Sequence, residues 1–248
     1  MSALRVENLT KSYPAFTLRD VSFTLERGRI MGLIGKNGAG KSTTLKAILN
    51  LVHRDGGSIE ALGLPLPDQE LACKQRLGVV LGGVDFYQHK RLRSITDVTS
   101  RFYPNWDQGA YARYLREFDL DESKRVRELS AGMRVKYQIA VALSHQAELL
   151  IFDEPTSSLD PVSRDELLTL FQAMAADGKR SILFSTHITS DLERCADDIT
   201  YIKDGQVLSS APKADFIAAF RCLRTPEDRG ELTLEEIMVR TERRAFHV

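Results

Sequence analysis

The sequence has no excess of charge of either sign. Its 34 lysines and arginines are balanced by 34 aspartates and glutamates, so the formal net charge is +0 with neutral histidines. Long-range attraction to nucleic acid or to an anionic membrane needs a basic surface, which a balanced composition does not provide for the molecule as a whole. The composition therefore predicts no nucleic-acid partner.

Cysteine is scarce as well, and long apolar runs are missing. The three cysteines, Cys73, Cys195 and Cys222, are far apart and odd in number, which argues against a disulfide framework and a paired metal motif. No stretch approaches the ~20 apolar residues of a membrane-spanning helix, and the first residues form no apolar signal core. We expect a cytoplasmic protein that works at a membrane only where another polypeptide holds it there.

The chain does contain short apolar runs that alternate with amphipathic segments. Continuous apolar residues at Ile30–Ile34, 149–152 and 181–184 are typical of strands that are buried on both faces. Amphipathic helical patterns follow these strands. This alternation predicts an α/β fold with a largely parallel sheet and flanking helices on both faces.

The middle and the end of the chain depart from this alternation. Apolar residues recur at helical spacing within residues 84–146, which we predict to form an inserted helical subdomain. Residues 63–68 predict a loop, and Asp204-Gly205 predicts a hairpin turn. We assign residues 1–220 to one domain and residues 221–248 to a mixed-charge tail of undefined role, with a short helix around residues 234–239.

A glycine-rich segment separates the first buried strand from the helix that follows. Residues 35–42 read Gly-Lys-Asn-Gly-Ala-Gly-Lys-Ser, which matches the phosphate-binding P-loop pattern in the required strand-to-helix context. Glycines let backbone N–H groups close around phosphate oxygens, and the helix N-terminus adds a positive dipole end. We expect Lys41 to reach the β- and γ-phosphates and the Ser42 hydroxyl to bind Mg²⁺. The other nucleotide-binding residues predicted here are Asn37, Gly38, Ala39, Gly40 and Thr43.

Two carboxylates end the second buried run. Asp153 and Glu154 directly follow residues 149–152, so they belong at the carboxyl edge of the sheet, where α/β folds bind ligands. We expect Asp153 to hold Mg²⁺ or its water shell, and Glu154 to orient and polarise the attacking water. Together with the P-loop, these residues predict a nucleoside triphosphatase, but kinases, GTPases and helicases share both motifs.

Four further features narrow the class. Residues 129–133, Leu-Ser-Ala-Gly-Met, precede a helix, and residues 157–160, Ser-Ser-Leu-Asp, follow the two carboxylates. His187 closes a buried strand, and Tyr13 follows Thr-Lys-Ser near the beginning of the chain. In order and spacing these features resemble the signature motif, the D-loop, the switch histidine and the adenine-stacking aromatic residue of ATP-binding cassette (ABC) ATPases. The resemblance extends from residue 4 to about residue 210.

The resemblance implies a fold, a reaction and partners. The ABC ATPase fold adds an antiparallel β subdomain to the P-loop sheet, and the ATPase converts ATP and water to ADP and phosphate. Two such chains, identical or different, would pack head to tail, with each ATP between one P-loop and the partner's signature helix. Ser130 and Gly132 would contact the γ-phosphate across the interface, with Asp160 among the nucleotide-binding residues. His187 would keep the γ-phosphate and Glu154 in register.

The resemblance also implies a separate transmembrane permease, which would hold the ATPase at the inner face of the cell membrane. Two departures from the family pattern bear on this coupling. Ala131 and Met133 replace the usual glycine and glutamine of the signature, and Gly82 stands where the Q-loop glutamine belongs. We hypothesise that Asp85 or Gln88 takes the coupling role.

Within the family, residues 102–107 and the Phe86-Tyr87 pair resemble bacterial exporters of antimicrobial peptides or drugs. Two alternatives stay open. One is a non-transport ABC ATPase that acts on ribosomes or DNA, for which tandem cassettes, long coiled-coil insertions and a basic surface would be expected. The other is a regulatory ATP-binding module that hydrolyses poorly, which Gly82 favours and which Glu154 and His187 oppose.

Overall fold

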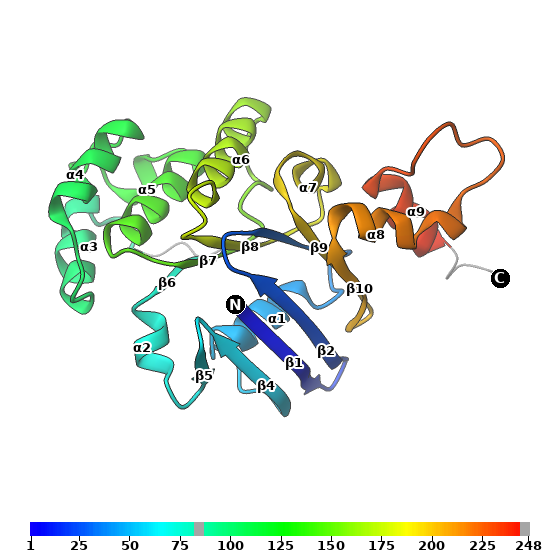
Figure 1. Cartoon of the computed structure of the whole chain (residues 1–248). Helices are drawn as coiled ribbons and strands as arrows, with labels where there is room; N and C mark the ends of the chain where they lie inside the picture. The colour runs from blue at the N-terminus through cyan, green and yellow to red at the C-terminus, as the bar shows by residue number, and fades with distance from the viewer. Residues whose placement is uncertain (82–86, 244–248) are drawn as a thin grey trace.

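The computed structural model describes residues 1–81 and 87–243, which form two sheets and their covering helices (Figure 1). The strands are β1 (Ser2–Tyr13), β2 (Phe16–Glu26), β3 (Ile30–Ile34), β4 (Gly56–Ala61), β5 (Leu64–Leu66), β6 (Leu77–Leu81), β7 (Leu149–Asp153), β8 (Ser181–Thr186), β9 (Asp198–Lys203) and β10 (Gln206–Pro212). The helices are α1 (Lys41–Ile48), α2 (Glu70–Lys74), α3 (Leu92–Thr99), α4 (Gln108–Glu117), α5 (Ala131–Ser144), α6 (Pro161–Ala175), α7 (Thr189–Cys195), α8 (Lys213–Ala219) and α9 (Leu234–Arg243).

The larger sheet positions the site. Within the described residues its strand order is β10-β9-β3-β8-β7-β6, and the strands from β9 to β6 run parallel. Strand β10 joins β9 in an antiparallel hairpin that turns at Asp204 and Gly205, as predicted. The smaller sheet, in the order β2-β1-β4-β5, is antiparallel. The predicted α/β fold with a largely parallel sheet and an antiparallel β part is confirmed.

Alternate side chains of the central strand enter two different cores. Ile30 and Ile34 pack with buried side chains of α5 to α9 on one face of the large sheet. Met31 and Leu33 pack on the other face with α1 and the small sheet. A strand that is covered on both faces has no polar face, which explains its continuous apolar sequence. Among the described residues, no helix is long and apolar enough to cross a membrane.

Helices α3, α4 and α5 lie between β6 and β7 in the chain and gather at one end of the sheet (Figure 1). They enclose a separate small core that includes Leu92, Tyr111 and Tyr137. At its centre the Thr96 hydroxyl lies 2.9 Å from the Tyr111 hydroxyl and 2.8 Å from the Tyr137 hydroxyl. This helical insertion occupies the described part of the predicted range 84–146.

Two local predictions differ from the structure. The loop predicted for residues 63–68 is wrong, because residues 64–66 form β5, which pairs with β4 through Ile59 and Leu66. Pro65 favoured a loop in the sequence pattern. However, β5 is an edge strand, where a proline is tolerated because its missing N–H interrupts no hydrogen bonds between strands. The short helix predicted around residues 234–239 extends to Arg243 as α9, and its Leu234 and Ile237 belong to a main core.

The helix-covered core should depend on Phe171 of α6. Its ring is fully buried and lies 4.5 Å from the Phe152 ring and 5.6 Å from the Phe184 ring, centre to centre. We expect Phe171→Ala to lower the free energy of unfolding by about 3–5 kcal/mol, because it opens a cavity between two strands and a helix. Urea denaturation measures this change. Val162→Ala, at an exposed position of the same helix, should change stability by less than about 0.5 kcal/mol; equal effects would contradict the core assignment.

Candidate functional site

The loop of residues 35–40 is held tightly between neighbouring strands. A side chain at Gly35 would place its Cβ 2.2 Å from the Ile202 carbonyl oxygen, and one at Gly40 would lie 2.6 Å from Leu18. Gly40 is also the N-cap of α1, with a φ of 116° that disfavours any other residue. Gly35 is therefore required by close backbone approach, and Gly40 by its backbone conformation. The loop delivers the N-terminus of α1 to the carboxyl edge of the sheet.

Lys41 lies inside this loop. Its side chain is only 5% exposed, and the ammonium donates to the carbonyl oxygens of Gly35 at 2.7 Å and Lys36 at 3.2 Å. The same nitrogen lies 3.3 Å from Oε1 of Glu154, which follows β7. A buried cation is costly unless charges and hydrogen bonds compensate it, and here both do. The lysine and the glutamate predicted from separate motifs are in contact.

Asp153 and Ser42 also meet. The Ser42 hydroxyl donates to Oδ1 of Asp153 at 3.0 Å, and the Ser185 hydroxyl donates to the same oxygen at 2.6 Å. Asp153 is 7% exposed, so this oxygen is fixed by its two donors. Carboxylate and hydroxyl oxygens are hard ligands of the kind that Mg²⁺ prefers. The donor set of Ser42 and Asp153 therefore fits the predicted magnesium site.

Glu154 has a left-handed backbone conformation, with a φ of 51°. Its N–H donates to the Ser185 hydroxyl at 2.9 Å, and its Oε2 lies 2.8 Å from Nδ1 of His187. Left-handed conformations are unfavourable for residues other than glycine and are concentrated at functional sites. No local sequence pattern predicts this conformation. No role was predicted for Ser185, which contacts both Asp153 and Glu154. Its position directly before Thr186-His187 was the available sequence signal.

The P-loop and Glu154 border a cleft of about 670 Å³. The described residues that line it are Ala15, Phe16, Asn37, Gly38, Gly40, Lys41, Ser42, Thr43, Glu154, Ser157 and His187. Ala39 is buried behind this lining, and its carbonyl accepts the Gly205 N–H at 3.0 Å. The structure thus brings together the P-loop residues, Glu154 and His187 around one cavity.

Tyr13, the predicted adenine-stacking residue, lies in the β1–β2 hairpin beside the cleft lining. Tyr13 pairs with Phe16 across the β1–β2 turn, and its ring faces the Lys11 ammonium at 5.5 Å. Tyr13 is not among the described lining residues, whereas Phe16 is, with its ring against Gly40. Phe16 shares a strand face with Leu18, two residues on, which is the sequence signal that could have identified it.

The signature residues lie apart from this cleft. Ser130 is the exposed N-cap of α5, and its hydroxyl accepts the Met133 N–H at 3.2 Å. Gly132 lies beside Ser163 of α6, whose N–H is capped by Asp160 at 3.0 Å. Hydrogen bonds from Ser163 lower the pKa of the Asp160 carboxyl. None of the predicted residues Ser130, Gly132 and Asp160 is among the described residues that line the cleft.

The predicted coupling residues are only partly described. Gly82 and Asp85 lie outside the described residues. The Gln88 carbonyl accepts the Arg127 N–H at 3.1 Å, just before the signature segment. The coupling hypothesis for Asp85 and Gln88 therefore stays a prediction.

Fold and site together define a P-loop nucleoside triphosphatase. The family model described as ABC transporter matches residues 18–157, and the chain belongs to this family. The Nod factor export ATP-binding protein I of Burkholderia lata is 37% identical over 200 residues, covering 78% of this chain and 66% of that protein. The bacitracin transport ATP-binding protein BcrA of Bacillus licheniformis is 31% identical over 212 residues, covering 84% and 69%. The chain spans about two thirds of the length of these curated relatives.

Solved structures agree with this assignment. An ATP-binding subunit of an ABC transporter has a TM-score of 0.83 and is 31% identical, with 96% of this chain and 98% of that chain covered. An ATP-binding cassette solved as a dimer in a post-hydrolysis state with ADP and Pi has the same fold, with a TM-score of 0.73, 21% identity and coverage of 84% and 98%. The predicted family and fold are confirmed.

The two aromatic residues at the β1–β2 turn allow a direct test. We expect Phe16→Ala to raise the KM for ATP about tenfold, because it removes the ring that borders the cleft beside Gly40. Phe16→Tyr keeps a stacking ring and should change the KM little. Tyr13→Ala measured in parallel decides between the residues: a loss confined to Tyr13→Ala would support the sequence-based prediction and contradict the role of Phe16.

Proposed function

We propose that this chain hydrolyses ATP to ADP and phosphate and thereby drives transport through a separate transmembrane permease. The observation that carries the proposal is the convergence of Lys41, Glu154 and His187 on the cleft beside the Ser42–Asp153 pair. Two family motifs and a lone histidine, far apart in the sequence, meet there within hydrogen-bond or ion-pair distance.

Phosphate binding would use the P-loop as it stands. The helix N-terminus and the backbone of Asn37, Gly38, Ala39, Gly40 and Thr43 offer N–H groups and a positive dipole end. Lys41 supplies a full charge, and its present anionic partner at 3.3 Å is Glu154. The β- and γ-phosphates would replace this carboxylate. Binding would thus free Glu154 at the moment when a water must be activated.

Ser42 and Asp153 would hold Mg²⁺, whose charge stabilises the phosphate oxygens when it is bound. Glu154 would accept a hydrogen bond from the attacking water and polarise it as the general base. His187 already contacts the Glu154 carboxylate at 2.8 Å, so it would hold that carboxylate in position beside the γ-phosphate.

A second cassette would complete the site. Ser130 and Gly132 begin α5, whose N-terminal N–H groups are suited to an anion, yet they lie away from their own P-loop. In a head-to-tail dimer they would contact the γ-phosphate bound by the partner, and Asp160 would fix the adjoining start of α6 at the interface. A cassette of the same fold was solved as a dimer, which supports an assembly of two chains.

The permease would place the complex at the inner face of the cell membrane, with residues 1–220 as the ATPase domain. The matches to proteins named for Nod factor export and bacitracin transport support an exporter, including the antimicrobial-peptide and drug type that the sequence resembles. Attachment to the membrane through a permease also fits the balanced net charge of the chain, because no direct attraction to lipid is needed.

Glu154 offers the sharpest test of the chemistry. Glu154→Gln keeps the shape but removes the charge that polarises water, so we expect ATP hydrolysis to fall by roughly 10²-fold or more. ATP binding should persist, and the ATP-bound dimer should become long-lived. Phosphate release and size-exclusion chromatography with ATP and Mg²⁺ measure both effects. Glu117→Gln, at an exposed ion pair on α4, is the matched control; a strictly monomeric Glu154→Gln protein would contradict the dimer.

Mixed dimers test the shared site. Ser130→Arg should stop hydrolysis without preventing nucleotide binding to its own P-loop, whereas Lys41→Ala should abolish productive binding. When the two variants form mixed dimers, one composite site carries both changes and the other carries neither. ATPase activity should therefore partly return on mixing. No recovery in dimers shown to be mixed would exclude a site shared between chains.

A further inference from the structure

The C-terminal helix α9 ends against the back of the P-loop. Its Glu242 side chain is only 11% exposed, and Oε2 lies 2.9 Å from the Lys36 ammonium. The Tyr201 hydroxyl of β9 donates to Oε1 at 2.7 Å, and the Lys203 ammonium lies 3.9 Å from Oε2. A single carboxylate from the tail thus joins the second residue of the P-loop to the neighbouring strand.

Lys36 takes part in the loop through its backbone rather than its side chain. Its carbonyl oxygen accepts the Lys41 ammonium at 3.2 Å and the Ala39 N–H at 3.1 Å. Lys36 is not among the described residues that line the cleft, whose lining begins at Asn37 in this segment. The Lys36 side chain therefore extends toward Glu242, and its carbonyl oxygen accepts the Lys41 ammonium.

Strand β9, which carries Tyr201 and Lys203, lies next to both the P-loop and the end of α9. Tyr201 is directly beside Ile34, the last residue of the strand that leads into the P-loop. The Lys203 ammonium donates to the Thr241 carbonyl at 3.0 Å, and the Gly205 N–H donates to the Ala39 carbonyl at 3.0 Å. The end of α9, the end of β9 and the P-loop are thus joined by consecutive polar contacts.

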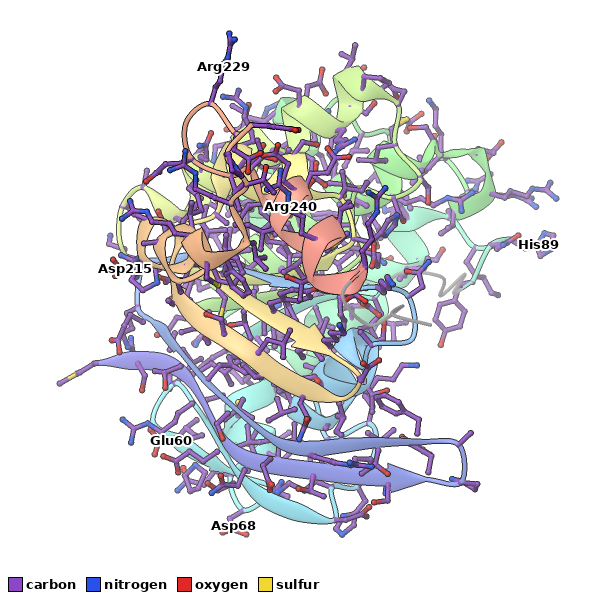
Figure 2. The ribbon with its side chains drawn as sticks, turned by 90° about the vertical axis from the view of Figure 1, so that its right-hand side faces the viewer. Glu60, Asp68, His89, Asp215, Arg229 and Arg240 are labelled. Carbon is purple, nitrogen blue, oxygen red and sulfur yellow. The ribbon has the colours of Figure 1, made fainter. Side chains whose placement is uncertain are left out.

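The helix itself is firmly docked. Leu234 and Ile237 are almost completely buried in a main core. Arg240 donates to the Leu223 carbonyl at 3.0 Å and pairs with Asp228, and Figure 2 shows it on the helix below the loop that carries Arg229. A docked helix holds Glu242 at a fixed position, so its carboxylate can transmit a positional constraint to Lys36.

The ion pair is favourable in the folded protein. Burial raises the pKa of the Glu242 carboxyl, but the hydrogen bonds from Lys36 and Tyr201 and the charge of Lys203 outweigh burial, and the pKa lies below its usual value. Glu242 is therefore ionised at neutral pH. Removing its charge would leave Lys36 without this partner and the Tyr201 hydroxyl with a weaker acceptor.

We propose that Glu242 is a positioning residue for nucleotide binding, which sets the P-loop through Lys36 and makes the C-terminal helix part of the ATP site. This inference rests on the proposed ATPase function. Because Glu242 acts on the loop that binds phosphate and not on the attacking water, its loss should weaken ATP binding and leave the chemical step unchanged.

The test is the division of the effect between KM and kcat. We expect Glu242→Gln to raise the KM for ATP about fivefold, with kcat within about twofold of wild type. Glu235→Gln, at an exposed position of the same helix, is the matched control and should behave like wild type. Thermal unfolding of each variant shows whether it is folded. An unchanged KM for Glu242→Gln, with or without a lower Tm, overturns the proposal.

Lys36→Met removes the same ion pair at its more exposed residue. The pair can therefore still be tested if Glu242→Gln does not fold. Lys36→Met should raise the KM to a similar extent, and the double variant should show no further increase, because both changes remove one interaction. Additive increases would show that Lys36 and Glu242 act separately and would overturn the proposal. Direct binding of ATP to wild type and its loss in Lys41→Ala report on the proposed function itself. If wild type binds ATP and Glu242→Gln binds it equally well, only the positioning role is rejected.

Discussion

The close approach of the P-loop backbone to its neighbours is the constraint on which the site depends. Gly35 passes against the Ile202 carbonyl, so a side chain there would collide with the backbone of β9, and Gly40 has a left-handed φ of 116° with the Leu18 and Phe16 side chains beside it. With the loop held there, α1 begins at the sheet edge and Lys41 is enclosed by carbonyl oxygens. A buried ammonium held by carbonyl acceptors favours an anionic partner, and this arrangement makes the cleft suited to phosphate.

Parallel pairing brings the remaining chemistry to the same edge. Asp153, at the end of β7, pairs in register with Ser185 of β8, and Thr186 of β8 pairs with Ile34 of β3. The strand ends therefore deliver carboxylates, a hydroxyl and the P-loop to one place, as expected where parallel strands end together. The left-handed turn at Glu154 then directs its carboxylate to both Lys41 and His187.

Two elements outside the cleft bear on how a nucleotide would be held there. The signature helix α5 and the start of α6 lie side by side at Gly132 and Ser163. Ser130 and Gly132 are not among the described residues that line the cleft, which suits the proposed assembly of two chains, in which they would reach the partner's nucleotide. On the opposite side the C-terminal helix closes the back of the loop through Glu242. Nucleotide binding would thus be shaped by a partner in front and by the tail behind.

Sequence alone determined the P-loop, the Asp153-Glu154 pair, the parallel sheet and the helical insertion, because each is written in contiguous residues or in a local period. It was incomplete where pairing between strands and contacts between distant segments decide the outcome. Residues 64–66 with Pro65 pair as an edge strand, and the β1–β2 pairing places Phe16 in the lining of the cleft, while Tyr13, its cross-strand partner, stays the predicted adenine-stacking residue. The contact of Glu242 with Lys36 had no local signal at all, since only the folded chain brings α9 to the P-loop.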